Sequence, residues 1–497
     1  MAEYHTLRTY GRFNPDILKI KKKLMNRHIL FSGFLLLSFA SAAQRPVVQT
    51  NYTPDPAPMV HDGTFYIYTG HDEDGVNSEF VMNEWRVYSS KDMVNWTDHG
   101  SPLSLETFKW AESGAWASQC VERNGKFYWY VCCIDKATHD MAIGVAVSDS
   151  PVGPFVDAVG APLVSRPGGY IDPTVFVEPN GNAWLYWGNP GLWCCKLNPD
   201  MVSYDKSFTI KGDHVEKVDD GVWKFIQDED SFGGPEKLAE GKVFSDYKDL
   251  YEEGPWFFKR GDRYYLAYAA GGVPEHISYS LSASPVGPWK YAGQIMPLQE
   301  MGSFTNHCGI IDFKGHHYFL YHCGTLPGGS GFNRSTAIEE FNYNPDGTIP
   351  EIHPTKNGIK PIGTLSPYGR VEAETMAWSE GLKTEPNDRT GVYVSEIHDG
   401  DYLEVRSVDF GDKGSDSITV AVASAAHGGI IDIYSGGKSG RLIASVEVPR
   451  TGGWEEWTTI TSPLLSSPTG IHDLTFLFRG RKGCKLFNFD YWGFNQK

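Results

Sequence analysis

Three carboxyl-bearing residues stand one or two positions before a proline in separate copies of one strand motif, and together they suit acid–base chemistry. They are Asp55 in Thr-Pro-Asp-Pro, Asp172 in Ile-Asp-Pro-Thr and Glu253 in Glu-Glu-Gly-Pro. Two carboxyl groups across a sugar ring can split a glycosidic bond, because one protonates the leaving oxygen while the other activates water. A third carboxyl near the acid raises the acid's pKa by repulsion. The alternative is that Asp-Pro and Gly-Pro only form turns.

A turn glycine followed by an aromatic strand recurs along the first two thirds of the chain. The five copies begin at Gly63, Gly125, Gly181, Gly261 and Gly315. A supersecondary unit repeated at this period predicts an all-β fold, a five-bladed β-propeller over residues 46–365 with about four strands per blade. Two seven-strand sandwiches are the alternative, but they would not repeat one motif five times. We interpret Lys211 to Lys248 as an inserted loop.

The residues just before each turn glycine occupy equivalent places in successive blades. Counting back eight or nine positions gives Asp55, Trp116, Asp172, Glu253 and His307. If the strand before each turn is the innermost one, these five side chains project into the same central channel. The prediction is a single pocket that holds three carboxyl groups, an aromatic ring and a histidine.

This pattern resembles glycoside hydrolase family 43, whose propeller carries two Asp and one Glu in a central pocket. The resemblance implies that Asp55 is the general base, Asp172 orients the acid and tunes its pKa, and Glu253 is the general acid. Glu252 is the alternative acid, but Glu253 directly precedes Gly-Pro, as the family acid does. The family inverts configuration, which implies a base-to-acid separation of roughly 6.5–9.5 Å.

The same resemblance implies three substrate-binding residues, Trp116, His307 and Arg334, and a calcium ion near His307. A hydrogen-bonded structural histidine is the alternative for His307. Stretches such as Met82-Asn-Glu-Trp85 and Gly331-Phe-Asn-Arg334 look most like members acting on xylan and arabinoxylan. We therefore expect release of α-L-arabinofuranosyl units. β-Xylosidase or arabinanase activity of the same fold is the alternative, and no cofactor is required for the chemistry.

The residue pattern of the last part of the chain predicts a second module. Alternating strands follow a Pro- and Gly-bearing link and predict a β-sandwich (jelly-roll) over residues 370–495. Its order of motifs resembles carbohydrate-binding module family 6. That resemblance implies Tyr393 and Trp454 as sugar-stacking rings, with Trp457 as alternative, and Asn488 as a hydrogen-bonding residue. It also implies a structural calcium ion whose ligands are Glu372, Glu374 and Asp490.

The N-terminus predicts export. A basic segment precedes the apolar run from Ile29 to Ala40, and Ser41-Ala42-Ala43 suits cleavage, so residues 1–43 are interpreted as a signal peptide, with Met25 as the alternative start. The run is too short for a membrane anchor. The protein is then periplasmic or extracellular. Its eight cysteines are best interpreted as buried free thiols.

The net negative charge of the chain limits the classes of molecule that it is expected to bind. A net charge of −17 repels a phosphate backbone, so nucleic acid is not expected. The expected partner is plant cell-wall polysaccharide, and no feature predicts an oligomeric state. A non-catalytic, glycan-binding propeller with a sandwich is the alternative from another class. A purely structural adhesin is less consistent with buried acids, whose desolvation costs stability.

Overall fold

A computed structural model describes residues 46–497 except 167, 238–240, 243–247, 299–301 and 357. The segment interpreted as a signal peptide, 1–43, lies outside these residues. Strands dominate the described part, with only two short helical turns, η1 (Leu105–Thr107) and α2 (Glu229–Phe232). In the same residues no helix has the length and apolar character needed to cross a membrane.

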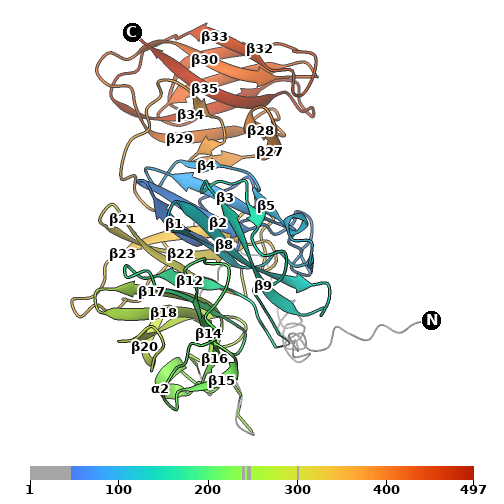
Figure 1. The fold of residues 1–497 in the computed structure, drawn as a ribbon. Coiled ribbons are helices and arrows are strands. Elements are labelled where there is room, and N and C mark those ends of the chain that lie inside the picture. Colours follow the sequence, from blue (N-terminus) through green and yellow to red (C-terminus); the bar gives the residue numbers. More distant parts are fainter. Residues whose placement is uncertain (1–45, 167, 238–240, 243–247, 299–301, 357) are drawn as a thin grey trace, which may run out of the picture. The chain divides into compact units, whose positions relative to one another are not determined.

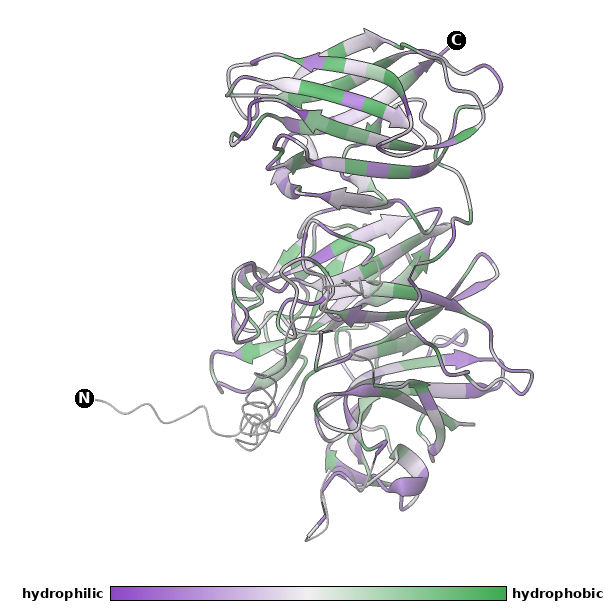
Figure 2. Ribbon diagram, turned by 180° about the vertical axis from the view of Figure 1, so that it is seen from behind, coloured by the Kyte–Doolittle hydropathy of each residue, from purple (hydrophilic) through white to green (hydrophobic). Residues whose placement is uncertain are grey.

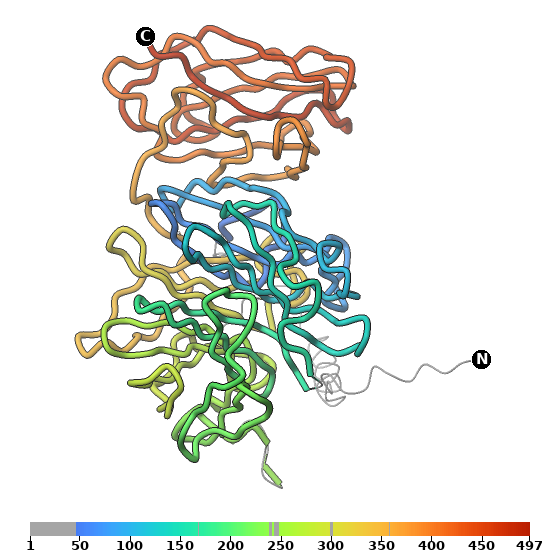
Figure 3. Tube along the Cα trace, viewed as in Figure 1, coloured from blue at the N-terminus to red at the C-terminus, as the bar shows by residue number. Residues whose placement is uncertain are grey.

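Residues 57–341 form five antiparallel sheets in sequence order (Figures 1 and 3). The first contains β1 (Ala57–His61), β2 (Thr64–Gly70), β3 (Glu84–Ser90), β4 (Trp96–Asp98) and β5 (Leu103–Ser104). The second contains β6 (Ala111–Ser113), β7 (Ser118–Arg123), β8 (Lys126–Asp135), β9 (Met141–Ser148), β10 (Val156–Asp157) and β11 (Val164–Ser165). The third contains β12 (Thr174–Val177), β13 (Ala183–Trp187), β14 (Trp193–Leu197), β15 (Val215–Asp219) and β16 (Val222–Phe225). The fourth contains β17 (Tyr251–Arg260), β18 (Arg263–Ala270), β19 (His276–Ser282) and β20 (Lys290–Met296). The fifth contains β21 (Gly309–Phe313), β22 (His316–Cys323) and β23 (Ser335–Phe341).

The repeated motif is the hairpin between the first two strands of each sheet. In β1–β2 the turn pair Asp62 and Gly63 has φ angles of 46° and 69°, the left-handed geometry of a tight hairpin. The strands before these turns, β1, β7, β12, β17 and β21, contact one another in a ring: β1 lies beside β7 and β21, and β12 joins β7 to β17. The starts of these five strands therefore face a common centre.

The predicted inserted loop is partly wrong. Of the stretch from Lys211 to Lys248, the first half forms β15 and β16, which extend the third sheet beyond β14. In β15 the polar Glu216, Lys217 and Asp219 are exposed, whereas the apolar Val222, Trp223 and Phe225 of β16 are buried against the sheet. The polar character of the segment therefore reflects an outer edge of a sheet, where one face meets solvent.

Residues after 370 form two further sheets. One contains β24 (Val371–Glu372), β27 (Lys383–Asn387), β28 (Gly391–Ser395), β30 (Ser415–Ala423), β33 (Thr458–Pro463) and β35 (Asn488–Gln496). The other contains β26 (Trp378–Glu380), β29 (Tyr402–Asp409), β31 (Gly429–Ser435), β32 (Arg441–Val448) and β34 (Ile471–Arg479). A short strand, β25 (Thr375–Met376), instead pairs with β4 of the first sheet.

Apolar side chains from both of these last sheets meet in one core, which includes Phe476, Phe489 and Trp492. Hydropathy alternates along their strands (Figure 2), as expected for strands with one buried face. The described cysteines are free, and all except Cys484 are buried, which confirms the interpretation of them as buried thiols.

Candidate active site

Left-handed backbone occurs just before two of the inner strands and within a third. Asp55 and Asp172 have φ angles of 54° and 56°, and a proline follows each. In the fourth sheet the left-handed residue is Gly254, with φ 58°, so the carboxyl-bearing residue there is Glu253, one position earlier. Non-glycine residues seldom adopt this conformation, and where they do it often marks a functional site.

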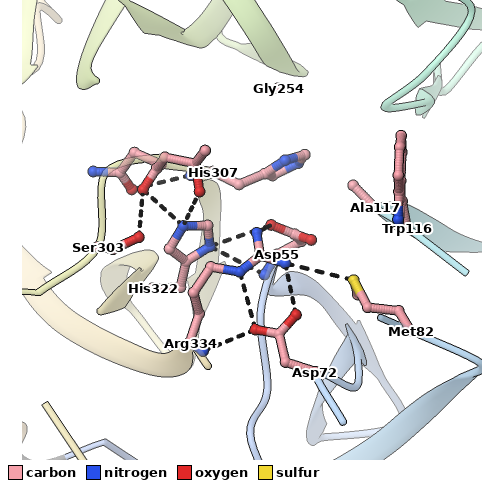
Figure 4. Close-up of polar contacts among 12 residues, drawn as sticks. Asp55, Asp72, Met82, Trp116, Ala117, Gly254, Ser303, His307, His322 and Arg334 are labelled. Carbon is pink, nitrogen blue, oxygen red and sulfur yellow. Dashed lines mark hydrogen bonds and ion pairs between the residues drawn. The ribbon is translucent and has the colours of Figure 1, made fainter. Parts of the chain in front are cut away.

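Asp55 is the centre of a buried charge network (Figure 4). Its side chain is 6% exposed, and its Oδ1 accepts from Nη1 of Arg334 at 3.0 Å. Asp72 holds the other side of the same guanidinium, accepting from Nε at 3.0 Å and from Nη2 at 2.9 Å. Burial alone would raise the pKa of Asp55, but Arg334 and His322 outweigh it and hold that pKa far below its usual range. Asp55 is therefore ionised.

His322 fixes the backbone of Asp55. Its Nδ1 lies 3.2 Å from the Asp55 amide nitrogen, and its Nε2 lies 2.9 Å from the carbonyl oxygen of Thr305. The same Nδ1 lies 3.2 Å from Oδ1 of Asp55, so the ring contacts both the backbone and the carboxylate of that residue. This ring spans two loops and keeps the strained Asp55 in place.

Glu253 and Asp172 form a second, more weakly charged group. The backbone N–H of Gly254 donates to Oδ2 of Asp172 at 3.0 Å, and Asn189 donates its amide to Oε2 of Glu253. Burial, followed by repulsion from Glu253 and Asp55, raises the pKa of Asp172 well above its usual range. Burial and the charge of Asp55 also raise the pKa of Glu253. These carboxyl groups therefore hold protons at pH values where Asp55 does not.

The geometry favours Glu253 over its neighbour Glu252 as the acid. Glu253 shares electrostatic contacts with Asp55, Asp172 and Arg334. Glu252 interacts mainly with Glu253, and burial together with that charge raises its pKa to about 7. Its Oε2 is buried without a hydrogen-bond partner.

Trp116 and His307 border the same pocket (Figure 4). Trp116 is half-buried, with its indole nitrogen buried and unpartnered. His307 is 7% exposed, and burial lowers its pKa to about 4, so the ring is neutral near pH 7. A Cβ on Gly254 would lie 3.1 Å from Nδ1 of His307, which places this histidine directly against the residue after Glu253.

In the sandwich, two of the expected sugar-binding residues are covered. Tyr393 is 3% exposed, its hydroxyl donates to Glu385 at 2.8 Å, and its ring meets Trp457 edge to face. Asn488 is fully buried and donates to the carbonyl oxygen of Trp454 at 2.8 Å. The rings of Trp454 and Trp457 are instead partly exposed, with Lys485 Nζ 5.0 Å from the centre of the Trp454 ring.

The three expected calcium ligands do not assemble into one site. Arg370 donates from Nε to Glu372 at 2.7 Å and from Nη2 to Asp490 at 3.3 Å, so a guanidinium already neutralises these two. Glu374 is buried, with Oε2 unpartnered. In the part of the chain that the structure describes, no three His, Cys, Asp or Glu side chains are grouped to hold a metal. As arranged, the trio does not fit the ion.

Sequence reasoning missed Asp72, Asn189, Glu275 and His322. Three of them stand at or just after the end of the second strand of a sheet, β2, β13 or β22, and Glu275 stands directly before the third strand of its sheet, β19. In an antiparallel hairpin the second strand ends where the first begins, so these residues reach the same rim as Asp55 and Glu253. Polar residues after each aromatic strand were the signal that could have found them.

Comparison with known proteins agrees with this geometry. Residues 43–349 match the model for glycosyl hydrolases family 43, and residues 372–496 match that for carbohydrate binding module (family 6). The chain belongs to glycosyl hydrolases family 43. It is thus a glycoside hydrolase, built as a β-propeller followed by a β-sandwich.

Several relatives extend over most of the chain. An arabinoxylan arabinofuranohydrolase of Bacillus subtilis (strain 168) is 32% identical, over 91% of this chain and 92% of the relative. A xylosidase/arabinosidase of Bacteroides ovatus is 32% identical, over 62% of this chain and 96% of its own. A crystal structure of a Bacillus subtilis arabinoxylan arabinofuranohydrolase in complex with cellotetraose, at 29% identity, covers 92% of this chain and 98% of its own with a TM-score of 0.75.

Proposed function

We propose that this family 43 hydrolase removes α-L-arabinofuranosyl units from arabinoxylan with inversion of configuration. The observation that carries the proposal is the different setting of two buried carboxyl groups in one pocket. Arg334 binds Asp55 at 3.0 Å and holds its pKa below the usual range, whereas burial and the charge of Asp55 raise the pKa of Glu253. The full-length similarity to arabinoxylan arabinofuranohydrolases supports the choice of substrate.

Each residue then has a defined task. Glu253 gives its proton to the glycosidic oxygen as the bond to the sugar breaks, and Asp55 takes a proton from the water that attacks the opposite face. Asp172 accepts a hydrogen bond from the N–H of Gly254 and so orients the acid residue Glu253, while its own pKa, raised by burial and by Glu253, keeps its carboxyl group protonated to a higher pH than usual. Arg334 and Trp116 form the wall that the departing sugar contacts. His307, neutral and buried, offers a hydrogen-bonding nitrogen without a charge.

Release of β-xylosyl units is the second candidate. It is favoured by the relatives named xylosidase/arabinosidase and beta-xylosidase, which match the propeller part of the chain. The same pair of carboxyl groups serves either sugar.

We further infer that the five sheets are the five blades of one closed propeller over residues 46–365, since their first strands contact one another in a ring. The sandwich of residues 370–495 then carries the enzyme to xylan through Trp454 or Trp457. The basic and apolar N-terminal segment supports export to the periplasm or the medium. Calcium is not proposed for the trio of Glu372, Glu374 and Asp490.

The deciding experiment compares free arabinose and xylose after digestion of arabinoxylan by the full chain, with Glu253→Gln and Asp55→Asn as inactive references. Arabinose alone is expected from the wild-type protein. Xylose without arabinose would transfer the assignment to β-xylosidase, and release of neither sugar, with binding to xylan retained, would favour the non-catalytic alternative.

A further inference from the structure

A second buried carboxyl group lies against Glu253. Glu275 immediately precedes β19 and is 5% exposed, and a side-chain hydrogen bond joins it to Glu253. The backbone N–H of Asn306 donates to Oε2 of Glu275 at 2.6 Å, and the N–H of Glu275 donates to the carbonyl oxygen of Phe304. Glu275 is therefore fixed at both its backbone and its carboxyl group.

The two carboxyl groups are held from opposite sides. Asn189, after β13, donates to Glu253, while Asn306, before β21, donates to Glu275. Two ionised carboxylates cannot share a hydrogen bond, because both groups would only accept, so the pair must retain at least one proton. The neighbouring amides limit how far either side chain can turn away.

We propose that Glu275 is a positioning residue of the general acid, sharing a proton with Glu253 and holding its carboxyl group toward the pocket. The inference rests on the proposed function for the role of Glu253. It adds a fourth carboxyl group to the three that the sequence predicts, and it explains why a carboxylic acid, which elsewhere would destabilise the fold, is buried at this position.

The charges around the pair support this role. Asp55, Asp172, Glu252 and Arg334 are the charged groups that face it. Burial and then the charge of Glu253 raise the pKa of Glu275 well above its usual range. Arg334 acts in the opposite direction on Glu253, but its guanidinium is already paired with Asp55 and Asp72. The pair therefore titrates as a unit.

The test uses full-length Glu275→Gln, which keeps the size of the side chain and removes the proton-sharing carboxyl group. Glu178→Gln is the matched control, because Glu178 is equally buried and hydrogen-bonded to Tyr264 and Trp184, away from the pocket. kcat/KM is measured against pH with a dinitrophenyl arabinofuranoside, whose leaving group needs no proton, and with an arabinoxylan oligosaccharide, whose leaving group does.

Loss of the pairing between Glu253 and Glu275 should slow only the step in which the acid protonates the leaving group. In Glu275→Gln we expect kcat/KM on the oligosaccharide to fall by about 10²-fold, a typical contribution of general acid catalysis. The dinitrophenyl substrate should lose little, and the alkaline limb of the profile should shift, because the hydrogen bond with Glu275 is one of the contacts that set the pKa of Glu253. Glu275→Asp should recover part of the loss. An equal loss on both substrates with an unmoved alkaline limb would show a merely structural role and overturn the inference.

A second measurement does not depend on turnover. Infrared titration should show a protonated carboxyl signal above neutral pH that is weaker in Glu275→Gln than in the wild-type protein and unchanged in Glu178→Gln, while Asp172 and Glu374, whose pKa values are also raised, contribute equally to all three. Identical bands in all three proteins would overturn the inference. Should the wild-type protein release no sugar, the proposed function fails, and this titration still decides whether the two carboxyl groups share a proton.

Discussion

The backbone N–H of Gly254 donates to Oδ2 of Asp172 at 3.0 Å, across 82 residues of sequence. This bond ties the residue that follows the proposed acid to the carboxyl group that tunes it. Because the bond is made by the backbone, it positions Glu253 whatever the rotamer of its side chain. The inner strands of the third and fourth sheets are thus joined at the point where the chemistry takes place.

Substitution of Gly254 tests this link. In Gly254→Ala the new Cβ would strain a left-handed residue and press on His307 at 3.1 Å. Gly261→Ala is a matched control, since Gly261 has φ 57° and open space around its Cβ position. Both variants should lose about 1–2 kcal/mol of unfolding free energy, measured by urea denaturation, but only Gly254→Ala should lose most of its kcat. Equal activities would contradict the link.

Asp72 is expected to act through Arg334. In Asp72→Asn the guanidinium keeps only Asp55 as a charged partner, so its orientation against the base is loosened. Breaking a buried ion pair costs about 3–5 kcal/mol when one partner is removed, and Asn should cost less because it still accepts one hydrogen bond.

Asp98→Asn provides the comparison for Asp72→Asn. Asp98 holds the buried Arg86 at 3.2 Å and is not among the groups that face Asp55 or Glu253. Thermal denaturation should show that both variants lose stability, while steady-state kinetics should show a fall in kcat only for Asp72→Asn. Full activity of Asp72→Asn would remove Asp72 from the positioning network.

Glu252 should affect stability more than catalysis. Its folded pKa is raised from 4.5 to about 7, so between these pH values the folded state binds more protons than the unfolded state. Stability from this group therefore falls as pH rises through that window. Urea denaturation at pH 5 and pH 7.5 measures this effect. Between these pH values the free energy of unfolding should fall less in Glu252→Gln than in the wild-type protein, and the variant should retain its activity. Loss of activity comparable with Glu253→Gln would instead identify Glu252 as the acid.

Binding by the sandwich should depend on the accessible indole rings. Trp454→Ala is expected to weaken retention on insoluble xylan, because a stacking ring is worth about 0.5–1.5 kcal/mol beyond the area it buries. Tyr393→Phe should change retention little, since the Tyr393 ring is covered and its hydroxyl is paired with Glu385. A pull-down with washed xylan measures the retention of both variants. Their release of arabinose from a small substrate should be unaffected. Unchanged retention in both Trp454→Ala and Trp457→Ala would exclude this site.

Local sequence predicted the inner strands and the residues at their starts, because a turn glycine and an aromatic run are contained within ten residues. The carboxyl groups of Asp55, Asp172 and Glu253 could be placed together for the same reason. Asp72 and His322 could not, since their contacts with Arg334 and Asp55 join residues more than 260 positions apart. A polar residue at the end of an aromatic strand marks such positions, but their partners are set by contacts between the first and fifth sheets, which no local pattern reports.

Exposure was the other property that local sequence did not reveal. Tyr393 and Asn488 have the residue types of a sugar-binding site, but the structure uses them beneath the accessible rings. Likewise, Arg370 stands only two residues from Glu372, yet its reach to Asp490 depends on β24 pairing with β35. The side chains that meet across strands decide whether carboxylates bind a cation or an arginine.

The most direct test of the central claim, that Asp55 and Glu253 act as base and acid on opposite faces of the sugar, is the configuration of the first product. Proton NMR during hydrolysis of an α-L-arabinofuranoside should show β-L-arabinofuranose first, before mutarotation, because water attacks the face opposite the leaving group. Initial appearance of the α anomer would mean a covalent intermediate and would contradict the account.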